Sequence, residues 1–179
     1  MSYCSYIQNH ISEQSDYLLH KYYHDNQYGF PIESDDELFG RLILEINQAG
    51  LSWTLMLRKQ AGFRAAYDNF SIEKIAAYSE NDRERLLHDP GIIRNRLKIN
   101  AAIANAQKIL ELKKEYGSFK SWLDAHVQLT KEEWIKLFRK TFKFTGGEIV
   151  NEFLMSTGYL PGAHSEDCPV YKLINELQD

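Results

Sequence analysis

The sequence predicts an all-α fold, and three observations support this. Apolar residues recur at helical spacing through most of the chain, no alternating strand pattern with a hairpin turn is present, and helix-capping motifs stand at several expected helix starts. We therefore expect one compact multi-helix domain. The predicted helices cover residues 35–49, 54–68, 72–78, 81–88, 97–115, 119–125, 131–141 and 147–157.

The helix predicted over residues 35–49 carries the first candidate functional residue. Ser34 and Glu37 form a capping box at its start, and an apolar stripe follows at helical spacing. Glu45 falls at the edge of this stripe, so its carboxylate should be partly withdrawn from water, which costs free energy unless a partner binds it. Two interpretations remain open: a half-buried glutamate paired with an arginine, or a carboxylate that serves a pocket.

Capping and stop signals define the later helices. Ser71 and Thr130 are suited to N-caps, and Glu133 completes a second capping box with Thr130. Gly158, followed shortly by Pro161, suits the C-terminal end of the helix predicted over residues 147–157.

A segment that ends in two glycines joins the helices predicted over residues 131–141 and 147–157. It reads TFKFTGG and ends in Gly146 and Gly147. A glycine pair allows unusual backbone angles and close approach of a ligand, and the following helix offers free N–H groups at its N-terminus. The local sequence fits a plain turn or a phosphate-binding hairpin about equally, and the basic run just before it favours phosphate.

Composition indicates a globular protein. A chain of 179 residues fits one domain over residues 1–179 and can bury about 70% of its unfolded surface. With 44% hydrophobic and 26% charged residues, and no apolar run near the roughly 20 residues that a span needs, no membrane association is expected. The N-terminus has no basic region followed by an apolar core, so we expect a cytoplasmic location, and also a monomer.

Charge alone argues against nucleic-acid binding, but its distribution does not. The net charge is −4, and a polyanion repels an acidic protein at long range. Two basic clusters could still attract DNA locally, although each taken alone fits a solvated helix face better. One cluster comprises Lys136, Arg139, Lys140 and Lys143, and the other comprises Arg94, Arg96 and Lys98.

Two cysteines and two histidines form a candidate metal site. Cys4 and Cys168 stand near opposite ends of the chain, and His164 precedes Cys168 by one helical turn. With His24 they provide the four ligands that a structural zinc takes. From the residues alone, two reduced cysteines with hydrogen-bonded histidines is the more frequent arrangement, and a disulfide is disfavoured in the cytosol.

Motifs along the chain resemble the 3-methyladenine DNA glycosylase I family of the helix-hairpin-helix superfamily. They are HDNQYG from His24, EINQAGLSW from Glu45, PGIIRNRLKI from Pro90, FKFTGGEIVNEFL from Phe142, and finally His164 and Cys168. This resemblance runs through nearly the whole chain. It implies a base-excision repair enzyme that flips out 3-methyladenine from double-stranded DNA and hydrolyses its bond to the sugar, leaving an abasic site. It also implies a structural zinc held by Cys4, His24, His164 and Cys168, and no organic cofactor.

The resemblance assigns roles to particular residues. Glu45 would be the catalytic residue and would accept hydrogen bonds from the adenine edge. Electron-rich rings would stack on the cationic base. These are Tyr6, Tyr23, Tyr28 and Trp53, each of which alone is more often a core aromatic. The DNA contacts would come from Gly50, Leu51, Lys143, Thr145, Gly146 and Gly147.

The chain departs from the family pattern at three residues and in one spacer. Tyr6 and Tyr28 stand where tryptophans are usual, and Gln27 replaces a common glutamate. The spacer between Cys4 and His24 is longer than usual. The substituted rings leave the range of accepted bases open, and the long spacer puts the role of Cys4 in doubt.

Two other classes of function compete with a glycosylase. A non-catalytic protein that binds damaged DNA would need the hairpin and the aromatic pocket but not Glu45. A zinc hydrolase or deaminase is disfavoured because the HExxH motif and the His-x-Glu with Pro-Cys-x-x-Cys pattern are missing from the sequence. The superfamily's water-activating aspartate would correspond to Asp167, which we discount because zinc would hold the chain on either side of it.

Overall fold

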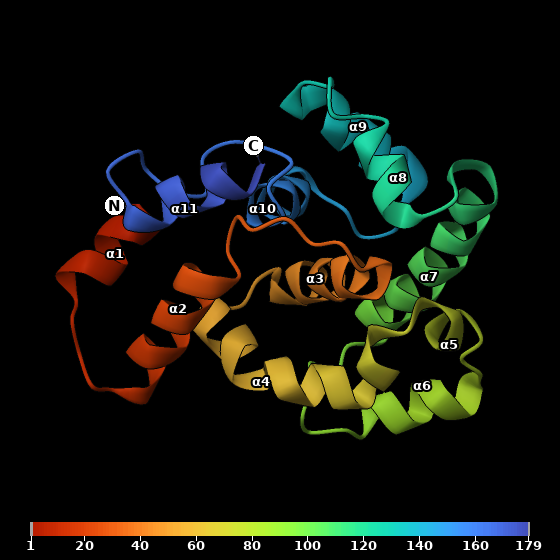
Figure 1. Cartoon of the computed structure of the whole chain (residues 1–179). Helices are drawn as coiled ribbons and strands as arrows, with labels where there is room; N and C mark the ends of the chain where they lie inside the picture. Colours follow the sequence, from red (N-terminus) through yellow and green to blue (C-terminus); the bar gives the residue numbers. More distant parts are fainter. Residues whose placement is uncertain (1, 179) are drawn as a thin grey trace.

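The structure, a computed structural model, describes residues 2–178, and within that range it is helical with no strand (Figure 1). The helices are α1 (Tyr3–Asn9), α2 (Ser15–Asn26), α3 (Asp35–Gln48), α4 (Trp53–Ala66), the short 3-10 helix η1 (Asp68–Phe70), α5 (Ile72–Ala76), α6 (Glu80–Leu87), α7 (Arg96–Tyr116), α8 (Phe119–Asp124), α9 (Lys131–Thr141), α10 (Gly147–Ser156) and α11 (Pro169–Gln178). The predicted all-α class is therefore confirmed. That one domain spans residues 1–179 stays a prediction.

All eight predicted helices are present, with ends that shift by at most two residues, and three further helices were missed. The missed helices are α1, α2 and α11. On α2 the buried side chains are Tyr17, His20, Tyr23 and His24. Tyrosine and histidine carry polar groups, so a search for apolar periodicity does not register a buried face made of them.

The predicted caps are confirmed at two helices and half confirmed at a third. Thr130 and Glu133 make the expected reciprocal capping box of α9, and Ser71 caps α5 through the Lys74 N–H. At α3 the Ser34 hydroxyl accepts from the Glu37 N–H as expected, but the rest of that capping box was wrong.

The Glu37 carboxylate faces α4 rather than the start of its own helix. Both of its oxygens accept hydrogen bonds from the Arg64 guanidinium, each at 2.7 Å. A bidentate pair with arginine is stronger than one bond to a backbone N–H, so the tertiary contact replaces the local one.

Helix α3 runs through the centre of the molecule, and the other helices surround it (Figure 1). Leu38, Phe39, Leu42 and Ile43 on this helix are at most 1% exposed and belong to the largest buried cluster, which also takes side chains from α4, α7, α9 and α10. Residues 38–47 of α3 are all buried, so a polar side chain within this stretch, such as Glu45, faces the core or a cavity and not bulk solvent.

The first helix, α1, lies beside the start of α11, so the two terminal helices meet (Figure 1). Cys4 on α1 and Cys168, Val170 and Ile174 at α11 form a small separate buried cluster. Tyr3 and Tyr6 of the same helix α1 line the cavity described below. None of the described helices combines the length and apolar character needed to cross a membrane.

Candidate active site and metal centre

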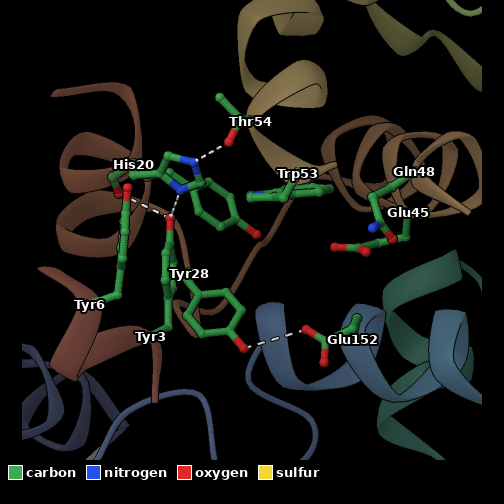
Figure 2. A pocket seen from close by; sticks show the side chains of 10 residues that line it. Tyr3, Tyr6, His20, Tyr28, Glu45, Gln48, Trp53, Thr54 and Glu152 are labelled. Atoms are coloured by element: carbon green, nitrogen blue, oxygen red, sulfur yellow. Dashed lines mark hydrogen bonds between the residues drawn. The ribbon is translucent and has the colours of Figure 1, made fainter. Parts of the chain in front are cut away.

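A cavity of about 550 Å³ opens between the N-terminal helices and α3. It is lined by Tyr3, Tyr6, His20, Tyr23, Tyr28, Glu45, Gln48, Trp53, Thr54 and Glu152. Glu45 and all four rings predicted to bind a base are among these residues (Figure 2). The structure thus brings together residues from five helices and one loop.

Glu45 is the most deeply buried charged group of the cavity. Its side chain is 4% exposed, and no hydrogen bond or ion pair joins its carboxylate to another described residue. Burial raises the pKa of Glu45 to about 8, Arg41 partly offsets this, and the negative charge of Glu152 adds to it. Burial therefore favours the neutral, protonated form of this carboxyl.

Arg41 lies one helical turn before Glu45, but its hydrogen bonds go elsewhere. Its guanidinium donates to the Tyr23 hydroxyl at 3.2 Å and to the Ser156 carbonyl at 3.1 Å. It also lies over the Tyr23 ring, 5.1 Å from the centroid. The interpretation that an arginine pairs with the Glu45 carboxylate is therefore wrong among the described residues.

The aromatic rings form a continuous wall opposite Glu45. Tyr23 and Trp53 lie 5.2 Å apart between ring centroids, and Tyr23 and Tyr28 lie 5.6 Å apart. Tyr6 stands further out, stacked on Tyr3 at 6.3 Å. Trp53 and Tyr28 border the space that the Glu45 carboxylate enters, whereas Tyr6 borders its outer side (Figure 2).

The sequence analysis gave no role to five of the lining residues. Tyr3, His20 and Thr54 form a hydrogen-bonded chain in which the Tyr3 hydroxyl lies 2.9 Å from His20 Nδ1 and the Thr54 hydroxyl 2.8 Å from His20 Nε2. Both imidazole nitrogens are thereby occupied, and burial lowers the pKa of His20, so this group supports the pocket wall as a neutral ring. Gln48 and Glu152 complete the lining. A signal was available for Gln48, which stands one turn after Glu45.

A second, larger cavity of about 900 Å³ forms a groove beside the first. It is lined by Gln48, Ala49, Gly50, Lys131, Ile135, Gly146, Gly147, Glu148, Ile149, Asn151 and Glu152. Three of the six predicted DNA contacts, Gly50, Gly146 and Gly147, therefore share one groove. Gln48 and Glu152 line both cavities, so the groove meets the pocket at these two side chains.

Two glycines of the groove, Gly50 and Gly146, have open space where a Cβ would stand, whereas a Cβ on Gly147 would contact Ile135 at 3.4 Å. Gly50 has a positive φ of 80°, which favours glycine, and no atom lies within 4 Å of a Cβ built there. Gly146 has an ordinary φ of −71° and the same open space. Gly146 is the N-cap of α10 and provides no side-chain cap, so the first N–H groups of this helix remain free for an anion.

Two expectations about the hairpin differ from the structure. The unusual backbone angle falls on Phe144, with φ of 60°, and not on the glycine pair. Thr145 is 5% exposed and its hydroxyl donates to the carbonyls of Phe138 and Phe142, so it fastens the hairpin from within. Lys143 is exposed. The Asn105 side chain holds its backbone by accepting from the Lys143 N–H and donating to the Lys143 carbonyl.

In the second basic cluster, Arg94 and Arg96 are exposed but Lys98 is not available to DNA. Lys98 is 5% exposed, and its ammonium donates to the Asn47 and Ala49 carbonyls at 2.8 and 2.9 Å. It therefore caps the C-terminus of α3 and supports the turn that carries Gly50. Arg96 pairs with two glutamates of α6. By contrast, Lys136, Arg139, Lys140 and Lys143 are all exposed.

Cys4, His24, His164 and Cys168 come together next to the pocket. All four are buried, and their ligand atoms lie within 4.8 Å of one another. Cys4 Sγ is 3.4 Å from His24 Nε2 and 3.5 Å from His164 Nδ1, and Cys168 Sγ is 3.8 and 3.7 Å from the same nitrogens. The long spacer after Cys4 forms part of α1 and the connection to α2, and it does not keep Cys4 from this group.

Each histidine of this group is oriented by a hydrogen bond that involves the ring nitrogen facing away from the cysteines. His164 Nε2 donates to the Tyr28 carbonyl at 2.6 Å, and His24 Nδ1 lies 2.7 Å from the Asp25 carboxylate. Such bonds fix the ring so that the remaining nitrogen faces a metal. The group could thus hold a metal ion. Asp167 is exposed and does not line the pocket.

Comparison with known proteins gives one consistent result. A family model described as methyladenine glycosylase matches residues 13–139. The chain is 34% identical to DNA-3-methyladenine glycosylase 1 of Escherichia coli (strain K12) over 168 residues, covering 83% of this chain and 89% of that protein. It is 32% identical to DNA-3-methyladenine glycosylase of Haemophilus influenzae (strain ATCC 51907 / DSM 11121 / KW20 / Rd), covering 89% of this chain and 94% of that protein.

Solved structures are similar as well. One describes the structural basis of 3-methyladenine recognition by 3-methyladenine DNA glycosylase I from Staphylococcus aureus. It superposes with a TM-score of 0.77 at 31% identity and covers 89% of this chain and 93% of that one.

Proposed function

This chain belongs to the methyladenine glycosylase family, and from that membership we propose how its pocket excises 3-methyladenine from alkylated DNA. It is a DNA-3-methyladenine glycosylase, a base-excision repair enzyme. The particular residues named below, the metal, the form of the DNA and the oligomeric state are our proposals.

Cleavage of the bond between 3-methyladenine and the sugar needs little acid catalysis by the protein. Adenine methylated at N3 and attached to deoxyribose carries a positive charge, which already weakens the bond between the base and C1′. The enzyme must take the base out of the stack, hold it, and let water add to the sugar as positive charge develops there. Tyr23, Tyr28 and Trp53 provide faces for stacking and cation–π attraction, worth about 1–3 kcal/mol per base. Tyr6 extends this surface outward.

Glu45 is proposed as the residue that recognises the charged base. Its carboxyl is buried, has no hydrogen-bond or ion-pair partner among residues 2–178, and opens into the pocket. A cation in the pocket favours the ionised form, which then accepts hydrogen bonds from the adenine edge. This single observation, an unpartnered buried carboxyl facing an aromatic cavity, gives the strongest support for the proposed site.

The groove beside the pocket is proposed to take double-stranded DNA. Gly50 and Leu51, on the turn after α3, would approach the duplex and fill the gap that the flipped nucleotide leaves. The free N–H groups at Gly146 and Gly147 and the charge of Lys143 would hold a phosphate. Thr145 would act indirectly, by fastening the hairpin. We expect the protein to bind DNA as a monomer.

The Cys4, His24, His164 and Cys168 group is proposed to hold zinc. A tetrahedral zinc with usual bond lengths places sulfur and nitrogen ligands about 3.6 Å apart, close to the four separations of 3.4 to 3.8 Å found here. Bound zinc would tie α1 and α2 to the start of α11. Four protein ligands leave no open position for water, which argues against a zinc hydrolase. Two thiolates suit a reducing compartment, in line with a cytoplasmic location. Hydrolysis needs no organic cofactor.

One experiment tests the proposed function directly. Purified protein is incubated with duplex DNA treated with a methylating agent, and the released bases are separated by chromatography and identified by mass. We expect free 3-methyladenine and abasic sites without strand cleavage. Binding to the methylated duplex with no released base would instead indicate the non-catalytic alternative.

A further inference from the structure

Glu152 is a second carboxylate in the base pocket that none of the sequence motifs assigns. It lies on α10, half-buried, and borders both the base pocket and the DNA groove. Glu45 borders the pocket and not the groove. Figure 2 shows the two carboxylates entering the space between Trp53 and Tyr28 from different helices.

The position of Glu152 places it near the bond between the base and the sugar of a flipped nucleotide. If the base occupies the pocket and the sugar-phosphate backbone occupies the groove, the bond that joins them must cross the boundary between the two cavities. Gln48 and Glu152 line both cavities and so define this boundary. Of these two side chains, Glu152 alone can carry a charge.

Resting on the proposed function, we infer that Glu152 is a catalytic residue that faces C1′ of the flipped deoxyribose and stabilises the positive charge that arrives there. As the C1′–N9 bond breaks, its electron pair stays with the base, which leaves neutral, and the positive charge moves to the sugar. Water then adds to C1′ and releases a proton to solvent. A nearby carboxylate stabilises the charged sugar more than the starting nucleotide, whose charge lies on the base.

The surroundings of Glu152 leave its oxygens available. One oxygen accepts from the Tyr28 hydroxyl and the other from the Asn151 amide, each at a long 3.5 Å. Each oxygen therefore keeps room for a further contact. Lys131 and Glu148 contribute opposing charges, and burial raises the pKa of Glu152. A cation at C1′ would be the favourable partner that this carboxylate otherwise lacks.

The test uses duplexes in which the flipped nucleotide is replaced by an analogue. One analogue is a pyrrolidine, whose ring nitrogen is protonated and mimics the charged sugar, and the other is a neutral tetrahydrofuran. We expect the wild-type protein to bind the pyrrolidine duplex more tightly and Glu152→Gln to lose about tenfold to a hundredfold of this preference. Glu152→Asp keeps the charge and should retain part of the preference for the pyrrolidine duplex. Glu115→Gln, an exposed residue of α7 that lines neither cavity, should keep the full preference.

A rate measurement separates this inference from the proposed function. Single-turnover release of 3-methyladenine should fall by a similar factor in Glu152→Gln, while the affinity for free 3-methyladenine changes less than threefold. A full pyrrolidine preference, an undiminished rate, or an equal loss of affinity for the free base would each overturn the role at C1′. If the wild type itself releases no 3-methyladenine, the proposed function fails first. Circular dichroism of each variant verifies its folding.

Discussion

Arg41 and Glu45 lie one turn apart on α3 and do not form an ion pair. The guanidinium is bound to the Tyr23 hydroxyl and the Ser156 carbonyl instead. Arg41 therefore supports the pocket wall and the end of α10, while Glu45 stays unpartnered and buried. An unpartnered buried carboxyl costs folding free energy, which is a reason to look for its role in ligand binding.

The raised pKa of Glu45 predicts a specific dependence of stability on pH. The folded protein holds the Glu45 proton up to about pH 8, whereas the unfolded chain releases it near 4.5. The stability this group contributes is therefore present below pH 4.5 and is lost as pH rises to about 8. Glu45→Gln, which stays neutral, should exceed the wild type by roughly 2–4 kcal/mol at pH 9 and by much less at pH 5.5. Urea unfolding at both pH values, with Glu115→Gln as control, measures this. An advantage of equal size at both pH values would contradict the assignment.

Glu45 also predicts which alkylated base is preferred. Adenine presents an amine donor at its six position, whereas guanine presents a carbonyl acceptor there. Once ionised by a cationic base, Glu45 accepts hydrogen bonds but cannot donate them, so 3-methyladenine should be released about tenfold to a few hundredfold faster than 7-methylguanine. Glu45→Gln should slow release of 3-methyladenine and narrow this preference. Chromatography of the bases released from methylated DNA provides the rates. Comparable wild-type release of both bases would remove Glu45 from this role.

The metal group predicts one tightly bound zinc per chain. Because zinc binding at this site requires the folded arrangement, its binding free energy adds to folding, and chelation or Cys168→Ala should lower the melting temperature. Ser165→Ala, on the same loop but outside the ligand set, is the matched control. Elemental analysis of protein purified without chelator gives the ion and its stoichiometry. Absence of zinc from such protein would refute the assignment.

The exposed basic run predicts salt-sensitive DNA binding despite the acidic net charge. Each phosphate neutralised by Lys140 or Lys143 releases counterions, so the double alanine variant should flatten the plot of log affinity against log salt by about one unit per lost contact. Lys74 and Lys114, exposed on α5 and α7, supply the control double variant. Fluorescence anisotropy across a salt series measures both slopes. Identical slopes in wild type and Lys140/Lys143 variant would place the DNA surface elsewhere.

The candidate site could be predicted from sequence only where its signals are local. Glu45, Tyr23, Tyr28 and Trp53 lie within one short span around a well-marked helix, and all of them line the cavity. Glu152 lies more than a hundred residues later and was not predicted. Its helix begins at a hairpin that did draw attention, but nothing local distinguishes a pocket-facing glutamate from a solvated one.

The sequence by itself determined the helical class and most helix boundaries, because capping and periodicity act over a few neighbouring positions. It also offered the four metal-binding candidates through their residue chemistry and the family resemblance, although Cys4 and Cys168 stand near opposite ends of the chain. Only the tertiary structure decided which polar and charged side chains are available to a ligand and which are bound within the protein. It buries Lys98 under the end of α3, directs Arg41 away from Glu45, turns the Thr145 hydroxyl inward and sets Glu152 where pocket and groove meet. Each of these outcomes depends on groups that are distant along the chain competing for the same hydrogen bonds and the same buried space, and that competition is settled only when the helices pack.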